Sequence, residues 1–316
     1  MSEAGVASEL GQIEIAHGEQ RVGVVALGGG LRSYEAGGRE LLNGFATGER
    51  PTSGRGQVLV PWPNRIEDGS YEFEGRRLQL PLNEPENGNA IHGLVRGVTW
   101  NLVDREPDRV VLDHALEPQP GYPFALGLSI EYALTDAGLT VTTTAWNLGS
   151  ENCPYGAGQH PYLTLGTPLI DTLRLRVPGR VVEFSDERGL PLRSAPVDGT
   201  KYDFRAGREI GETVLDNAFT ELERDGDGRA RVLLDDPASG AGLTLWVDES
   251  YRYLMLYTGD THADVARHGL AVEPMTCPPN AFRTGDSVIR LEPGESIATS
   301  WGIEPRLPAE GGPDDG

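Results

Sequence analysis

The sequence predicts an all-β protein that contains few and short helices. Apolar side chains recur at every second position in many segments, which is the spacing of half-buried antiparallel strands. Glycine (42) and proline (23) make up about a fifth of the 316 residues, as is typical of a chain with many turns. We find no stretch of ten or more residues with the i, i+3, i+4, i+7 apolar spacing of an amphipathic helix.

Turn-forming residues join several of these segments into predicted β-hairpins. Thr135-Asp136-Ala137-Gly138 is one such turn, and Glu74-Gly75 and Pro293-Gly294 are two others. The segments that they connect are residues 71–73 with 78–80, 128–134 with 139–148, and 289–292 with 297–303. The same alternation predicts further strands at 173–177 and 243–247.

The chain is predicted to form one domain, a β-sandwich over residues 1–304. Its length would suit two average domains, but sandwiches often reach such lengths as one unit, and no Ser/Gly/Pro-rich linker divides the sequence. Residues 305–316 are acidic and rich in Gly and Pro, with few apolar side chains to bury. We therefore expect a disordered acidic tail there.

The charge balance excludes some partners. With 27 basic and 48 acidic residues the formal net charge is −21, which repels phosphate backbones and anionic lipid headgroups. We therefore expect neither nucleic acid nor a membrane as a partner. Lys201 is the only lysine, so Schiff-base chemistry would depend on this one residue, and no supporting motif surrounds it.

The two cysteines and the first residues indicate the compartment. Cys153 and Cys277 lie far apart and in no C-x-x-C pair, which indicates neither a zinc ribbon nor a disulfide framework and favours a reducing compartment. The first residues lack the basic and then apolar pattern of a secretory signal, and no apolar run of about 18 residues follows. We therefore expect a cytoplasmic protein.

Two polar residues at predicted strand ends are candidates for acid and base chemistry. Pro161 favours an extended backbone at His160 and so restricts the direction of the imidazole. Glu273 follows the apolar residues 270–272 and precedes Pro274, where burial and nearby cations would shift its pKa in opposite directions. Each also has a structural interpretation, His160 as a core histidine bonded to a backbone carbonyl and Glu273 as a carboxylate that caps a turn.

Four further residues are candidates for ligand binding. Trp62 could stack on a ligand, and the forked guanidinium of Arg65 could hold a ligand oxygen or neutralise a nearby carboxylate. His92 has the same two interpretations as the other histidine. Asp216, with Asn217 after it, could bind two hydroxyls or close an Asx-turn.

Five of these candidates, all except Trp62, lie in five segments whose order matches one known family. The segments are Asn64-Arg65-Ile66, His92-Gly93-Leu94-Val95-Arg96-Gly97, His160-Pro161-Tyr162, Asp216 with Phe219, and Glu273. In this set, and over nearly its whole length, the chain resembles the aldose 1-epimerase (mutarotase) family. The resemblance implies a large antiparallel β-sandwich of the galactose mutarotase type.

The chain departs from the family pattern at two places. His160-Pro161-Tyr162 is followed by Leu-Thr-Leu, where many members have Phe-Asn-Leu. Glu273 lies in E-P-M-T-C-P-P-N-A-F, where galactose-type members have a glutamine two residues after the glutamate. The latter form resembles the branch related to the sulfoquinovose mutarotase of bacterial sugar-sulfonate pathways. The departures affect the expected sugar and not the expected reaction class.

The resemblance implies an enzyme that opens and recloses a pyranose ring. It implies that Glu273 takes a proton from the C1 hydroxyl and that His160 gives one to the ring oxygen. Arg65, His92 and Asp216 would then hold the sugar hydroxyls. No cofactor and no metal are expected, the partner is a small aldose, and a monomer and a homodimer both remain open.

Five arginines early in the chain bear on the choice of sugar. Arginine binds anionic groups through two parallel hydrogen bonds, so a sulfonated or phosphorylated sugar is one interpretation. Scattered surface arginines are the other. The five are Arg55, Arg65, Arg76, Arg77 and Arg96.

Other functions remain open on the sequence. A glycoside hydrolase would use Glu273 and Asp216 as its two carboxylates, about 5–5.5 Å apart if retaining or roughly 6.5–9.5 Å apart if inverting. A carbohydrate-binding module would keep the aromatic residues and Asp216 but would not need both histidines and the glutamate. A cupin-type metal enzyme is not favoured, because the H-x-H element of such sites is absent.

Overall fold

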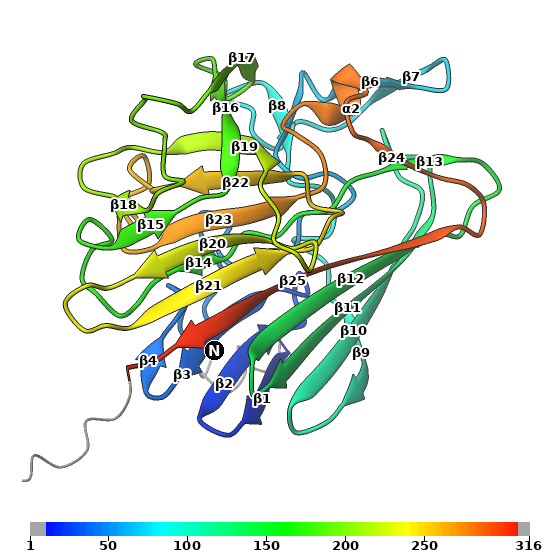
Figure 1. Ribbon diagram of the computed structural model, residues 1–316. Coiled ribbons are helices and arrows are strands. Elements are labelled where there is room, and N and C mark those ends of the chain that lie inside the picture. Colours follow the sequence, from blue (N-terminus) through cyan, green and yellow to red (C-terminus); the bar gives the residue numbers. More distant parts are fainter. Residues whose placement is uncertain (1–10, 309–316) are drawn as a thin grey trace, which may run out of the picture.

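The computed structural model describes residues 11–308, and antiparallel β-strands dominate it (Figure 1). The helix found in this range, α2 (Ala281–Thr284), has four residues. The all-β prediction is therefore confirmed. No helix between residues 11 and 308 is both long enough and apolar enough to cross a membrane.

The largest sheet has nine strands and crosses the molecule from β18 to β9 (Figure 1). Its order is β18 (Arg208–Glu209), β15 (Arg174–Arg176), β20 (Ala230–Asp235), β21 (Gly242–Val247), β25 (Ser296–Arg306), β12 (Gly138–Asn147), β11 (Leu126–Thr135), β10 (Arg109–Leu116) and β9 (Asn101–Arg105).

A six-stranded sheet lies in the upper part of the view in Figure 1. Its order is β14 (Tyr162–Leu163), β23 (Leu270–Met275), β22 (Tyr253–Tyr257), β19 (Asp216–Leu222), β16 (Gly179–Ser185) and β17 (Pro191–Pro196).

Smaller sheets complete the fold. A four-stranded sheet contains β1 (Gln12–His17), β2 (Gln20–Val25), β3 (Leu31–Ala36) and β4 (Arg39–Glu40). Three two-stranded ribbons pair β5 (Arg65–Glu67) with β8 (Asn89–Ile91), β6 (Ser70–Phe73) with β7 (Arg76–Gln79), and β13 (Cys153–Tyr155) with β24 (Ile289–Leu291).

The alternation in the sequence places every second side chain of β11 in the core. Leu128, Ile130 and Tyr132 are fully buried, and the residues between them are partly exposed. The core is tied to the loop before β14 by Gln159, whose Nε2 donates to the Tyr132 hydroxyl (2.9 Å) and whose Oε1 accepts from Trp301 Nε1 (2.6 Å). These buried bonds fix the backbone next to His160.

Two predicted hairpins are confirmed and the third is wrong. β6–β7 and β11–β12 form as expected, but β24 pairs with β13, and β25 lies between β12 and β21. Asn147, at the end of β12, explains the difference. Its backbone bonds to Gly294 and Glu295 in the Pro-Gly turn, and its side chain donates to Leu291 O (2.9 Å). These bonds place the start of β25 beside β12, so β25 pairs with β12 and not with β24.

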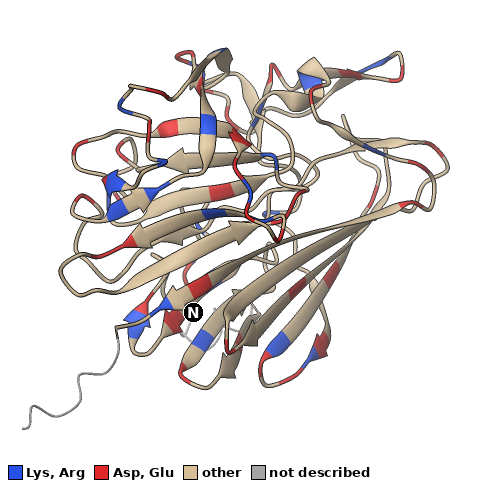
Figure 2. Cartoon of the chain, in the orientation of Figure 1, with Lys and Arg blue, Asp and Glu red and all other residues tan. Residues whose placement is uncertain are grey.

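The last strand extends past the predicted end of the domain. β25 runs to Arg306, with Pro305 opposite Leu243 and Arg306 opposite Gly242. The first two residues of the predicted tail are therefore part of a sheet, and residues 309–316 lie outside the described range. Figure 2 shows that the acidic positions are spread over many strands and loops, with basic positions among them.

A pair of substitutions in β11 tests the packing. We expect Ile130→Ala to lower the free energy of unfolding by about 2–5 kcal/mol, because Ile130 is fully buried and its loss leaves a cavity. Ser129→Ala, at the neighbouring and partly exposed position, should change the free energy by no more than about 0.5 kcal/mol. Urea unfolding followed by circular dichroism measures both, and equal losses would contradict this packing.

Candidate active site

A polar cavity of about 290 Å³ brings together five of the six predicted site residues. This volume is at the small end of the usual range for ligand pockets, about 300–1,000 Å³, and suits a small molecule. The five come from separate elements and are Arg65 at the start of β5, His92 after β8, His160 before β14, Asp216 at the start of β19, and Glu273 within β23.

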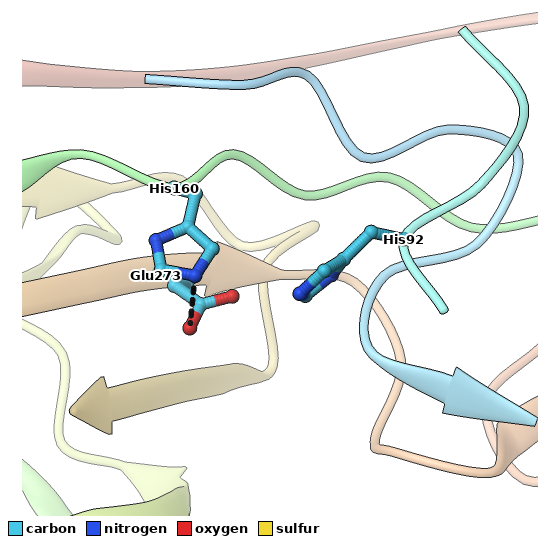
Figure 3. Close-up of side chains that lie close together, drawn as sticks. All are labelled: His92, His160 and Glu273. Carbon is cyan, nitrogen blue, oxygen red and sulfur yellow. Dashed lines mark ion pairs between the residues drawn. The ribbon is translucent and has the colours of Figure 1, made fainter. Parts of the chain in front are cut away.

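The strand register places His160 opposite Glu273. Tyr162 pairs with Ala271 where β14 meets β23, and Gly158 pairs with Met275 four residues earlier in the chain. Continuing this antiparallel register puts residue 160 opposite residue 273. The two side chains meet with Nε2 of His160 3.4 Å from Oε1 of Glu273 (Figure 3).

Burial controls the protonation of this pair. His160 is 5% exposed and Glu273 is 2% exposed. Burial lowers the pKa of His160 to about 3. Burial raises the pKa of Glu273 well above its ordinary value, and the charge of Asp216 adds to the rise while Arg65 opposes it. Both shifts favour the arrangement in which His160 is neutral and the proton of the pair is on Glu273.

The imidazole of His160 is packed on several sides. The Tyr162 ring stacks on it at 5.0 Å with an interplanar angle of 9°, and the His92 ring meets it edge-on at 5.5 Å. Gly54, at φ 77°, covers it so closely that a Cβ there would lie 2.7 Å from Cδ2 of His160. The Tyr162 hydroxyl donates to Ser53 O (2.9 Å) and holds this loop against the ring.

Arg65 is both a cavity residue and the partner of a carboxylate. Its Nε and Nη2 donate to both oxygens of Glu84 at 2.8–3.1 Å, and Glu84 also accepts from Asn89 Nδ2 (2.9 Å). The hydrogen bonds to Glu84 keep the pKa of Arg65 above its ordinary value although burial acts in the opposite direction. Sequence analysis missed Glu84, since nothing near it in the loop after β7 indicates a partner.

Asp216 and Asn217 face different parts of the protein. Asp216 is exposed on the cavity wall, and its carboxylate forms no side-chain hydrogen bond with any described residue. The surrounding protein partly desolvates this carboxylate and raises its pKa, while Arg65 opposes the rise. Asn217 is buried and donates to Glu183 O (2.9 Å), because successive strand residues point to opposite faces. The alternative in which both side chains bind hydroxyls is therefore wrong.

Trp62 does not line the cavity. It is 2% exposed, and its ring packs in the core against Phe282 at 5.7 Å. A residue that stacks on a sugar must present its ring face to the ligand, and this ring face is covered by protein. Tyr257 and His262 do line the cavity, although sequence analysis identified neither of them.

Two of the five early arginines, Arg65 and Arg96, line the cavity. Arg96 donates to Gln57 Oε1 and to Ile91 O, each at 3.2 Å, and forms no ion pair with a described carboxylate. Arg76 pairs with Glu151 on the surface instead. Arg65 and Arg96 thus lie at the cavity, whereas Arg76 lies on the surface.

His92, His160 and Glu273 have the composition of a metal site, with ligand atoms within 4.8 Å of one another (Figure 3). Their chemistry does not fit that role. The backbone N–H of Asn64 donates to Nδ1 of His92 (3.2 Å), so the lone pair of Nδ1 is already engaged. In the neutral ring the proton is then on Nε2, and neither nitrogen has a free lone pair for a metal.

Comparison with known proteins identifies the family. The family model described as aldose 1-epimerase matches residues 11–303. The chain belongs to the aldose 1-epimerase family. It is 33% identical to the Escherichia coli (strain K12) protein YihR over 284 residues. This region covers 90% of this chain and 89% of YihR.

Two relatives with named activities are more distant. The chain is 27% identical over 296 residues to an Escherichia coli (strain K12) aldose 1-epimerase, with 83% of each chain covered. It is 28% identical over 275 residues to the galactose mutarotase of Sus scrofa, with 78% of this chain and 77% of that one covered.

Solved structures share the fold. A putative aldose 1-epimerase from Escherichia coli K12 superposes with a TM-score of 0.82 at 22% identity, over 94% of this chain and 99% of that chain. A GalM/aldose epimerase homologue from C. elegans gives a TM-score of 0.83 at 20% identity, over 95% and 99%. The expected galactose mutarotase-like sandwich is therefore confirmed.

The close approach of Gly54 to His160 yields a prediction. Gly54→Ala should displace the imidazole and lower the aldose epimerase activity, measured by polarimetry, by about tenfold or more. Gly166→Ala is the matched control, because Gly166 also has a positive φ (72°) but has open space where its Cβ would be. Both variants bear the backbone cost of a left-handed alanine, so equal rates in the two would contradict a specific role for the contact.

Proposed function

We propose that the protein is a mutarotase, which interconverts the α and β anomers of a pyranose sugar by opening and reclosing the ring. The observation that carries this proposal is the 3.4 Å contact between His160 Nε2 and Glu273 Oε1 in a polar cavity. Ring opening requires the removal of one proton from the C1 hydroxyl and the delivery of another to the ring oxygen. Two adjacent groups that share one proton are suited to both tasks.

The proton transfers balance over the whole cycle. In the charged form of the pair, Glu273 takes the proton of the C1 hydroxyl, the bond between C1 and the ring oxygen breaks, and His160 protonates that oxygen. The pair is now neutral, and the aldehyde carbon rotates about its bond to C2. On closure His160 takes back the proton from the hydroxyl, which attacks the other face of the carbonyl, and Glu273 protonates the new C1 oxygen.

Both protonation states of the pair are accessible in this cavity. Burial favours the neutral pair, which corresponds to the open-chain stage, and the positive charge of Arg65 favours the carboxylate of Glu273 and thus the charged pair. The two states differ only in whether one proton is on Glu273 or on His160, whose nearest side-chain atoms are 3.4 Å apart. Oε2 of Glu273 is buried and has no hydrogen-bond partner among the described residues, which leaves it available to a bound hydroxyl.

The other predicted residues are proposed to bind sugar hydroxyls. Asp216 offers an acceptor without a competing side-chain partner, and Arg65 and His92 offer donors. A site of such groups discriminates well, because a buried polar group left unmatched by a ligand is costly. The sugar itself, whether a neutral hexose or a sulfonated or phosphorylated one, and a cytoplasmic location stay predictions of the sequence.

The catalytic assignment is tested by substitution at both positions. We expect Glu273→Gln and His160→Asn each to lower the catalysed rate of anomer interconversion by about 10²–10⁴, since each removes one proton-transfer group. Polarimetry with α-anomers of glucose, galactose, glucose 6-phosphate and sulfoquinovose, corrected for spontaneous mutarotation, measures the rates and identifies the sugar.

Matched controls are Glu249→Gln and His268→Asn, which change the same side chains on the surface outside the cavity. Rates near wild type in both cavity variants would contradict the assignment. Tight sugar binding by the wild type without catalysis would instead favour a binding module. Release of the chromophore from an aryl glycoside would favour a hydrolase.

The shared proton sets the expected pH dependence. The pKa of His160 is lowered to about 3, so lowering the pH from 7 to 5 should add no second proton to the pair and should leave kcat/KM unchanged. Raising the pH through the elevated pKa of Glu273 removes the single proton, and kcat/KM should fall. A loss of kcat/KM on acidification with the ordinary histidine pKa of about 6.5 would contradict a neutral pair.

A further inference from the structure

Asn64 and His92 form a backbone unit at the end of the β5–β8 ribbon. Arg65 of β5 pairs with Ile91 of β8. One residue further out, Asn64 precedes β5 and His92 follows β8, so the two lie opposite each other. His92 N–H donates to Asn64 O (2.9 Å), as in a regular ladder. Asn64 N–H, however, donates to Nδ1 of the His92 side chain (3.2 Å). A side-chain nitrogen has taken the place of a backbone carbonyl in the ladder.

Both residues adopt a left-handed backbone conformation, with φ 54° at Asn64 and 61° at His92. This conformation is uncommon for residues other than glycine, and asparagine tolerates it better than most. The side chain of Asn64 supports the bend, since its Oδ1 accepts the backbone N–H of Arg65 (2.9 Å). The bend is what directs the N–H of Asn64 at the imidazole.

This hydrogen bond determines which nitrogen of His92 carries the proton. A backbone N–H cannot give up its proton, so Nδ1 must offer a lone pair, and the proton of the neutral ring must reside on Nε2. Burial, aided by the positive charges of Arg96 and Arg65, lowers the pKa of His92 well below its ordinary value, so the ring stays neutral.

We propose that Asn64 is a positioning residue that holds His92 in the neutral Nε2–H tautomer, and so makes His92 a hydrogen-bond donor to the sugar. His92 lines the cavity, and one nitrogen of its ring lies within 4.8 Å of the ligand atoms of His160 and Glu273, so the ring borders the region where the hemiacetal would react. The part of this inference that concerns the sugar depends on the proposed function. The part that concerns the tautomer does not.

The same tautomer keeps divalent metals out of the site. A zinc-bound histidine uses the lone pair of one ring nitrogen and donates the N–H of the other to an acceptor. Here the group facing Nδ1 is the N–H of Asn64, which is a donor. Coordination of a metal through Nε2 would place the ring proton on Nδ1, and the N–H of Nδ1 would then face the N–H of Asn64. His92, His160 and Glu273 therefore have the spacing of a metal site and a hydrogen-bond arrangement that opposes one.

Nitrogen-15 NMR of histidine-labelled protein tests the tautomer directly, because protonated and unprotonated ring nitrogens have well-separated shifts. The six histidines are few enough for His92 to be assigned by its loss in His92→Asn. We expect wild-type His92 to have its proton on Nε2. Both Asn64→Gly and Asn64→Ala keep the backbone N–H. Asn64→Gly tolerates the positive φ and should retain this tautomer, whereas Asn64→Ala disfavours that φ and should yield a mixture.

Ser287→Ala controls for backbone strain, since Ser287 has a similar φ (53°) and lies outside the cavity. It should leave the His92 signals unchanged. In activity assays we expect Asn64→Ala to lose about tenfold more kcat/KM than Asn64→Gly, mostly through kcat. If Asn64→Ala does not fold, the wild-type and Asn64→Gly spectra still decide the question.

Two results would overturn the proposal. One is a proton on Nδ1 of His92 in the wild type, or an unaltered tautomer in folded Asn64→Ala. The other is the appearance of intense tetrahedral cobalt bands when Co²⁺ is added to the wild type and their loss in His92→Asn. If instead the tautomer is as expected and no sugar is mutarotated, the proposed function fails while the role of Asn64 in setting the tautomer stands.

Discussion

The antiparallel register between the β14 segment and β23 is the constraint on which the site depends. Because Gly158 and Tyr162 are both paired with residues of β23, His160 has no freedom to move along the strand away from Glu273. The register also removes both groups from water, and this burial shifts their pKa values in opposite directions. The register thus accounts both for the contact between the two residues and for the opposite shifts of their pKa values.

The sequence was sufficient where the structure depends on local pattern. Period-two alternation and turn residues identified β11 and β12 with nearly their observed bounds, because burial on one face of a sheet demands that spacing. Sequence analysis also identified His160 and Glu273, through their position at strand ends and the family resemblance. Five of the six expected residues line the cavity, and four of them lie at or next to the end of a strand, whereas Glu273 lies inside β23, which continues through Pro274 to Met275.

What the sequence did not predict depends on contacts between distant segments. Pairing of β25 with β12 is decided by Asn147, and the partnership of Arg65 with Glu84 is decided by a loop with no repeating pattern. Trp62 was misplaced because its aromatic character suits a core as well as a sugar site, and only the position of Phe282 distinguishes the two. The hydrogen bond from the backbone N–H of Asn64 to His92 cannot be predicted from the residue types, because any residue except proline has such an N–H.

The cavity is assembled from two kinds of element. His160 and Glu273 belong to the ladder of the six-stranded sheet, whereas Arg65 and Arg96 lie on or near the short β5–β8 ribbon and His262 lies in the loop after β22. Such an assembly separates the chemistry from the choice of molecule. Under the proposed function, substitutions in the ribbon and the loop would change which sugar binds and leave the contact between His160 and Glu273 in the sheet in place.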